Sequence, residues 1–167
     1  HPGDVWTVDI LDIDSHLRKT HKESCAASKR PYDPDEVDHI YHPHKLLIFI
    51  DRFSRWVEAF LLEKDPTADE VLDIFVNEIV RRHGYPRAVT SDRGPNLMQG
   101  SVAEYYAACG VQLATNDSYM HNTAGLVERF NGTLKDILRG FITDVDEDSD
   151  AMGLRWWRYL TYALLSY

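Results

Sequence analysis

Residues Val5–Ile13 read VWTVDILDI, with β-branched or apolar side chains at both alternating sets of positions. This pattern predicts a strand buried on both faces, as the inner strands of α/β sheets are. Asp9 lies in the middle of that strand, where a carboxylate is costly unless it is paired or binds a metal. We therefore expect a central strand that carries a functional carboxylate.

The sequence that follows this strand predicts a β-hairpin first, and then strands that are connected by helices. A Thr67 N-cap followed by Glu70 forms a capping-box signature, and Gly84 ends that helix. The order predicts an α/β fold with a five-stranded mixed sheet flanked by helices. The further predicted strands are Lys45–Asp51, Trp56–Leu62, Arg87–Ser91 and Val111–Thr115, and the other predicted helices are Asn96–Cys109, Ala124–Ile142 and Met152–Tyr167.

The length of 167 residues and the 44% hydrophobic content predict one domain, residues 1–167, with a polar insertion at about 14–44. The longest clean apolar run, Leu46–Ile50, is too short to span a membrane. Two distant cysteines, Cys25 and Cys109, make no disulfide framework, so we expect an intracellular protein. The absence of a starting Met suggests a piece excised from a longer chain.

The charge balance is acidic, with 18 basic and 27 acidic residues and a net charge of -9. This argues against a general nucleic-acid binder, which is usually basic. Five of the acidic residues lie in Thr143–Asp150, TDVDEDSD. An enzyme that gathers carboxylates around divalent metals would also be acidic, so charge alone leaves both classes open.

Two further carboxylates stand where ligands are expected. Asp92 ends the fourth predicted strand, at the carboxyl edge where α/β sheets bind ligands. Glu128 lies early in a predicted helix, and helical spacing places Asn131, Lys135 and Arg139 on the same face. The opposite face is apolar, with Leu126, Phe130, Leu134, Ile137 and Phe141.

Two strands and a helix thus supply three carboxylates, Asp9, Asp92 and Glu128. Metal-dependent phosphoryl transfer needs oxygen ligands for two Mg²⁺ or Mn²⁺ ions about 3.5–4 Å apart. Lys135 and Arg139 can contact DNA phosphates from the same helix face. The pattern favours a two-metal enzyme that acts on a phosphodiester.

Three motifs in order resemble the catalytic core of retroviral and retrotransposon integrases. They are Trp6-x-x-Asp9, Thr90-Ser91-Asp92-Arg93-Gly94-x-Asn96 and Gly125-x-Val127-Glu128-Arg129-x-Asn131-x-x-x-Lys135. The 35 residues between Asp92 and Glu128 match the D,D-35-E spacing of that family. The hairpin sequence from Ile50 to Ala59 looks most like the long-terminal-repeat, gypsy-like retrotransposon branch.

The resemblance implies a ribonuclease H-like fold in which Asp9, Asp92 and Glu128 are the catalytic metal ligands for two Mg²⁺ or Mn²⁺ ions. It implies that Asn131, Lys135 and Tyr119 lie near the DNA. The implied activity is 3′-end processing of element DNA and strand transfer into target DNA. The implied setting is the nucleus of the host cell, in a homo-oligomer with neighbouring integrase domains and no membrane.

The chain departs from the family pattern at several positions. The gap from Asp9 to Asp92 is longer than is typical, Ala124 stands where Gln is common, and His121 where Pro is common. Asp12, Asp14 and Asp51 are alternative carboxylates, and Asp51 is expected to cap the hairpin turn. A zinc site in the insertion is less favoured than a polar loop, and its candidate ligands would be His16, His21, Cys25, His39, His42 and His44.

Two other functions stay open at this point. One is a domesticated, catalytically silent module that binds DNA or protein, and the other is a DDE transposase of the same fold. The last predicted helix offers a surface for self-association, with Leu154, Trp157, Leu160, Thr161 and Leu164 beside Trp156 and Tyr159. The alternative is that this helix is buried within the monomer.

Overall fold

The structure, a computed structural model, describes residues 1–13, 22, 23, 26, 27, 29, 45–91, 97, 100–115, 121–143, 157 and 159–167. Almost all of the predicted insertion, with its histidines, lies outside these residues. The chain divides into two compact units. The first holds residues 1–11, 47–60 and 65–128, and the second holds residues 12–46, 61–64 and 129–167. The prediction of a single domain remains a prediction.

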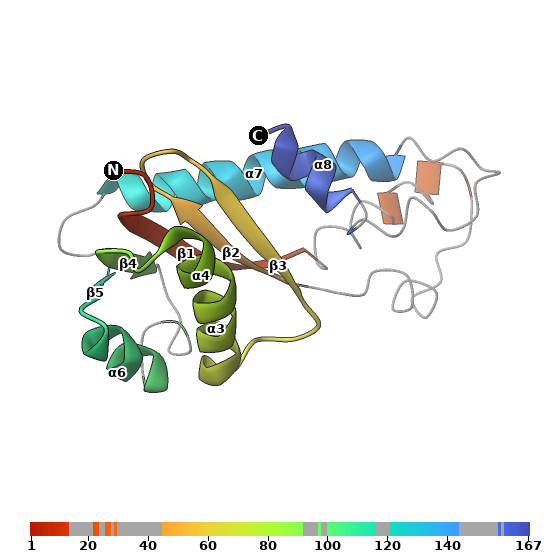
Figure 1. The fold of residues 1–167 in the computed structure, drawn as a ribbon. Helices are drawn as coiled ribbons and strands as arrows, with labels where there is room; N and C mark the ends of the chain where they lie inside the picture. Colours follow the sequence, from red (N-terminus) through yellow and green to blue (C-terminus); the bar gives the residue numbers. More distant parts are fainter. Residues whose placement is uncertain are drawn as a thin grey trace. The chain divides into compact units, whose positions relative to one another are not determined.

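A five-stranded sheet of order β3-β2-β1-β4-β5 forms the framework (Figure 1). Strand β1 pairs in parallel with β4, and β4 in parallel with β5, whereas β2 and β3 form a hairpin. This mixed sheet with flanking helices confirms the predicted fold class. The strands are β1 Val5–Asp12, β2 Lys45–Asp51, β3 Val57–Leu62, β4 Ala88–Ser91 and β5 Gln112–Thr115.

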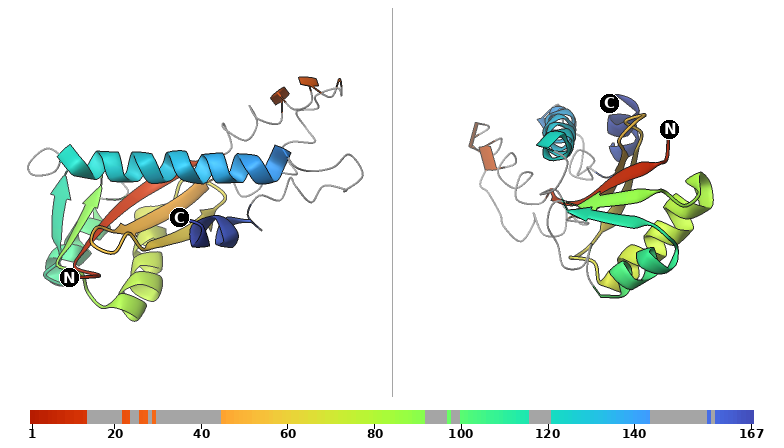
Figure 2. Two further views of the ribbon diagram at one scale, coloured as in Figure 1. Left: turned by 90° about the horizontal axis from the view of Figure 1, so that it is seen from above. Right: turned by 90° about the vertical axis from the view of Figure 1, so that its left-hand side faces the viewer.

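Two helical segments lie side by side on one face of this sheet (Figures 1 and 2). The first runs through α3 Ala68–Ile74, the π-helical turn η1 Phe75–Val80 and α4 Arg81–His83, and the second is α6 Ser101–Ala108. Phe75 joins the layers, because its ring lies 6.2 Å from Phe49 on β2 and 4.7 Å from Tyr106 on α6. These buried rings form the centre of the core on this face.

The start of the first helix confirms the predicted capping box. The Thr67 hydroxyl accepts a hydrogen bond from the Glu70 amide (3.3 Å), and the Glu70 carboxylate accepts one from the Thr67 amide (2.7 Å). The helix ends before Gly84, whose φ of +80° favours glycine. The π-helical turn was not predicted, because the buried residues Val71, Phe75 and Ile79 recur every four residues, a spacing also compatible with an ordinary α-helix.

Within the second unit, the described part of the chain is mainly helical. Helix α7, His121–Thr143, enters this unit at Arg129, and α8 spans Leu160–Leu165. Phe130 is fully buried and packs edge-on against the Tyr167 ring at 4.9 Å. None of the described helices is long and apolar enough to cross a membrane.

Helix α7 differs from its prediction in two details. It begins at His121 and not at Ala124, because a short run of polar residues is compatible with a helical turn as well as with a loop. Leu138 is fully buried, whereas Ile137, expected on the apolar face, is half-buried. Phe130, Leu134 and Leu138 follow one another at four-residue steps, and helical residues four apart lie on one face.

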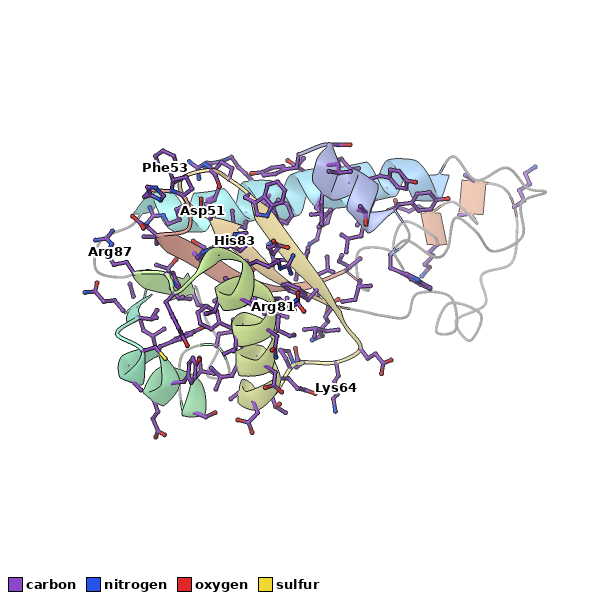
Figure 3. The ribbon with its side chains drawn as sticks, in the orientation of Figure 1. Asp51, Phe53, Lys64, Arg81, His83 and Arg87 are labelled. Carbon is purple, nitrogen blue, oxygen red and sulfur yellow. The ribbon has the colours of Figure 1, made fainter. Side chains whose placement is uncertain are left out.

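A buried carboxylate fixes the turn between β2 and β3 (Figure 3). Asp51 is 1% exposed and accepts hydrogen bonds from the Gly3 amide (3.1 Å), the Ser54 amide (2.9 Å) and the Ser54 hydroxyl (2.6 Å). The prediction that Asp51 caps the hairpin is confirmed. The same side chain also ties the N-terminal segment to the turn.

We expect Asp51→Ala to lower the free energy of unfolding by about 3 kcal/mol, because three donors lose a charged acceptor in a buried place. Chemical denaturation measures this change. The matched control is Asp73→Ala, an exposed carboxylate on α3, which should change stability by less than about 0.5 kcal/mol. Equal effects of the two substitutions would contradict a structural role for Asp51.

Candidate active site

The site begins with the register of two parallel strands. Strands β1 and β4 pair residue by residue: Val5 with Ala88, Trp6 with Val89, Thr7 with Thr90 and Val8 with Ser91. The buried hydroxyl groups of Thr7 and Thr90 lie 2.9 Å apart and share a hydrogen bond. The Thr90 hydroxyl also lies 3.4 Å from the Trp6 carbonyl oxygen, to which it can donate. A polar pair in an apolar sheet holds one register better than interchangeable apolar pairs do.

Asp9 follows directly after the last of these pairs, on β1, and is half-buried. Side chains alternate between the two faces of a strand. Trp6 points toward the layer of α3 and α6, because its ring lies 5.1 Å from the His83 ring on α4. Thr7 and Asp9 therefore point to the opposite face of the sheet.

Ser91 is the last residue of β4 and is 2% exposed. Its hydroxyl is buried and has no hydrogen-bond partner within the part of the chain that the structure describes. Such a group is costly unless an additional ligand or water reaches it. Asp92, the predicted second carboxylate, comes next and lies outside the described residues.

Helix α7 spans four of the predicted site residues. Glu128 is exposed, directly after the buried pair Leu126 and Val127. Asn131 and Lys135 are half-buried. Arg139 is exposed, and its guanidinium forms an ion pair with Asp136 at 3.3 Å. Helical spacing aligns these four positions along one face of α7.

Several candidates lie outside the described residues, and their predicted roles remain predictions. These are Asp92, Tyr119, Asp14, Cys25 and the histidines of the insertion. Within the described ranges, no group of three or more His, Cys, Asp or Glu side chains could hold a metal ion. Because Asp92 falls outside those ranges, this finding does not bear on the predicted triad.

The Thr7–Thr90 pair, which positions the strand that carries Asp9, was not predicted from the sequence. A signal for it was present, since Thr7 and Thr90 each directly follow an apolar residue within a predicted strand. A hydroxyl on one strand predicts nothing alone, because its partner is known only when the register is known. The interaction of Thr7 with Thr90 becomes visible only when the pairing of β1 with β4 is known.

Residues 1–121 of this chain match the family described as "integrase core domain". The chain belongs to the integrase core domain family. The match covers most of the chain, including the positions of Asp9 and Asp92, and stops before Glu128.

Viral polyproteins are among the relatives of this integrase core domain. It is 34% identical over 166 residues to the Gag-Pol polyprotein of baboon endogenous virus (strain M7), covering 98% of the chain and 8% of the polyprotein. It is 37% identical over 137 residues to the Gag-Pol polyprotein of woolly monkey sarcoma virus, covering 82% of the chain and 7% of the polyprotein. The chain thus spans less than a tenth of these relatives.

Solved structures confirm that the integrase core domain has the ribonuclease H-like fold. The catalytic core domain of HTLV-2 integrase in complex with magnesium, in its dimeric form, has a TM-score of 0.60 at 20% identity and covers 99% of this chain and 86% of that one. A chain of the simian T-cell lymphotropic virus intasome with the PP2A regulatory subunit B56 gamma gives 0.65 at 20% identity, with 99% and 48% covered. The catalytic core of BIV integrase gives 0.61 at 19% identity, with 98% and 82% covered.

We expect the Thr7–Thr90 pair to contribute about 1 kcal/mol to the free energy of unfolding. Thr7→Val and Thr90→Val keep the side-chain shape and remove one hydroxyl each, so each single variant should lose stability. The double variant should lose less than the sum, because the second substitution removes a hydroxyl that has already lost this partner. Denaturant unfolding of all four proteins tests this, and strictly additive losses would show that the hydroxyls do not interact.

Proposed function

We propose that this chain is the catalytic core of a retroelement integrase that processes the 3′ ends of element DNA and joins them to target DNA. The observation that carries the proposal is the register of β1 and β4. Continued by one residue beyond Val8 and Ser91, it would pair Asp9 with Asp92. Paired residues of neighbouring strands point to the same face, with the strands about 4.8 Å apart. Two carboxylates so placed could share metal ions.

The donor chemistry fits a hard divalent cation. Asp9, Asp92 and Glu128 offer only carboxylate oxygens, the ligands that Mg²⁺ and Mn²⁺ prefer. When bound, two such ions supply charge neutralisation at the phosphate and lower the pKa of an attacking hydroxyl.

The chain's own residues would then bind and orient the DNA. Lys135 and Arg139 neutralise phosphates, and Asn131 and Tyr119 contact the strand near the scissile bond. In the first step the oxygen of a water attacks phosphorus, and the 3′ oxygen of the bond that breaks leaves. In the second step the new 3′ hydroxyl attacks a target phosphodiester in the same in-line manner. Neither step forms a covalent bond to the protein.

We propose that the element is a long-terminal-repeat retrotransposon. The relatives named above are retroviral polyproteins, whereas the Ile50–Ala59 hairpin sequence favours a gypsy-like retrotransposon. We further propose a homo-oligomer, because joining two element ends to one target needs two active sites held together, and neighbouring integrase domains in a host nucleus. A silent domesticated module or a DDE transposase is the alternative, and the reading frame around the chain discriminates them.

We expect Asp9→Asn, Asp92→Asn and Glu128→Gln each to lower DNA joining more than about a hundredfold, since each removes a metal ligand. Joining of labelled duplexes with the terminal sequences of the element, in Mg²⁺ or Mn²⁺, measures this. The matched control is Asp12→Asn, an exposed carboxylate at the end of the same strand, which should keep joining.

A second readout does not depend on joining. Mn²⁺ should raise the Tm of the wild-type protein and of Asp12→Asn, but not that of Asp9→Asn, because ligand binding to the native state stabilises it. Full joining by Asp9→Asn would refute the assignment. An equal Tm shift in Asp9→Asn would refute metal binding by Asp9.

We expect Lys135→Ala to weaken duplex DNA binding and to make its salt dependence shallower by about one unit, as for the loss of one phosphate contact. Arg139→Ala should have a smaller effect, because Asp136 already pairs with that guanidinium. Titrations at several salt concentrations compare the two. An unchanged slope for Lys135→Ala would identify it as a residue that does not contact the DNA.

A further inference from the structure

The turn between β2 and β3 exposes large aromatic rings that the proposed reaction does not use. Phe53 is 69% exposed and Trp56 is 57% exposed, within a turn that also carries Arg52 and Arg55. We refer to these four residues as the hairpin tip. Figure 3 shows Phe53 projecting from this turn. Two exposed aromatic side chains, three residues apart in one turn, are candidates for contact with a ligand.

Arg52 and Arg55 give the hairpin tip its positive charge. Within the described chain, neither Arg52 nor Arg55 forms an ion pair. Burial, together with the nearby Arg55 guanidinium, lowers the pKa of Arg52, so the two cations repel each other.

Among the described residues, three carboxylates near the hairpin tip have partners other than Arg52 and Arg55. Asp51 binds Gly3 and Ser54. Glu58 binds Arg82 at 3.2 Å and His83 at 3.1 Å. Asp4 pairs with the N-terminal amine at 3.2 Å. The hairpin tip is therefore a local cationic site on a chain of net charge -9.

The backbone of the turn is fixed, and one position is strained. The Asp51 amide donates to the Trp56 carbonyl and the Arg55 amide to the Asp51 carbonyl, both at 2.9 Å. Arg55 has a φ of +68°, in the left-handed region that favours glycine, at a cost of about 1 kcal/mol or more. An arginine there lowers stability and presents a charge, and strain of this kind is concentrated at functional sites.

We propose that the hairpin tip binds single-stranded DNA, with Arg52 and Arg55 on the phosphates and the rings of Phe53 and Trp56 stacked on bases. Trp56 is oriented for this, because its indole N–H donates to Glu58 at 3.1 Å and its ring stays exposed. Cations beside stacking rings are the common elements of single-strand sites. Duplex DNA fits the hairpin tip less well, because its bases are stacked on one another and cannot stack on the two rings. An acidic peptide also fits less well, because it supplies negative charge but few flat groups for stacking.

The hairpin tip is separate from the proposed active site. The Arg52 amide donates to the Val5 carbonyl at 2.9 Å, so the turn lies beside the beginning of β1. Asp9 comes four residues later, about 13 Å along the strand. Binding at the hairpin tip therefore needs neither the carboxylates nor a metal, and it goes beyond the proposed function.

The test measures binding of a fluorescent 15-nucleotide oligo(dT) by anisotropy in EDTA. Arg55→Gly removes a charge and the backbone strain, so it should weaken binding severalfold and lower the salt slope by about 0.7 while the Tm stays equal or rises. Trp56→Ala should weaken binding about tenfold or more, the usual loss of one stacked base. Arg81→Ala is the matched control for charge, since Arg81 is exposed on α4, and it should bind like the wild type.

Further binding measurements distinguish a failure of this proposal from a failure of the proposed function. Asp9→Asn should bind oligo(dT) normally even if it joins no DNA. The proposal is overturned if the wild type does not bind oligo(dT), or if Arg55→Gly and Trp56→Ala bind it like Arg81→Ala. It is also overturned if Trp56→Ala weakens binding of a 15-base-pair duplex equally, or if a polyglutamate peptide binds the hairpin tip and oligo(dT) does not.

Discussion

The hydrogen bond between the buried hydroxyls of Thr7 and Thr90 fixes how β1 and β4 pair, and the candidate active site depends on that pairing. Helices α3 and α6 pack on the face that carries Trp6 and Phe49. The other face is the one to which Asp9 points. The aromatic core thus stabilises one side of the sheet, while the proposed carboxylate site belongs to the other.

Much of the fold followed from local patterns in the sequence. The five strands were predicted from short runs of β-branched and apolar residues. The Thr67 capping box and the cap function of Asp51 were predicted from residues near in sequence. The catalytic carboxylates were proposed from motif spacing, and Asp92 lies outside the described residues. The π-helical turn and the left-handed Arg55 were not predictable, because each depends on a backbone conformation that neighbouring contacts select and that the sequence pattern does not encode.

The acidity of the chain does not conflict with a role on DNA. Several carboxylates already have donors of their own: Asp51 in the turn, Glu58 with Arg82 and His83, and Asp136 with Arg139. Net charge counts these groups in full, although their partners offset much of their local field. The charge that a phosphate meets is therefore set by which cations are left uncompensated, and Arg52 and Arg55 belong to that group.

Because side chains alternate along β1, the register between β1 and β4 decides which face of the sheet each side chain occupies. If β1 slipped by one residue against β4, Asp9 would turn toward Trp6's present neighbours, and Trp6 would turn away from His83. A carboxylate in the buried layer where Trp6 now lies would cost several kcal/mol. A misregistered chain would therefore lose stability and the proposed metal ligand together, so proteases that remove unstable chains would also remove those without the proposed site.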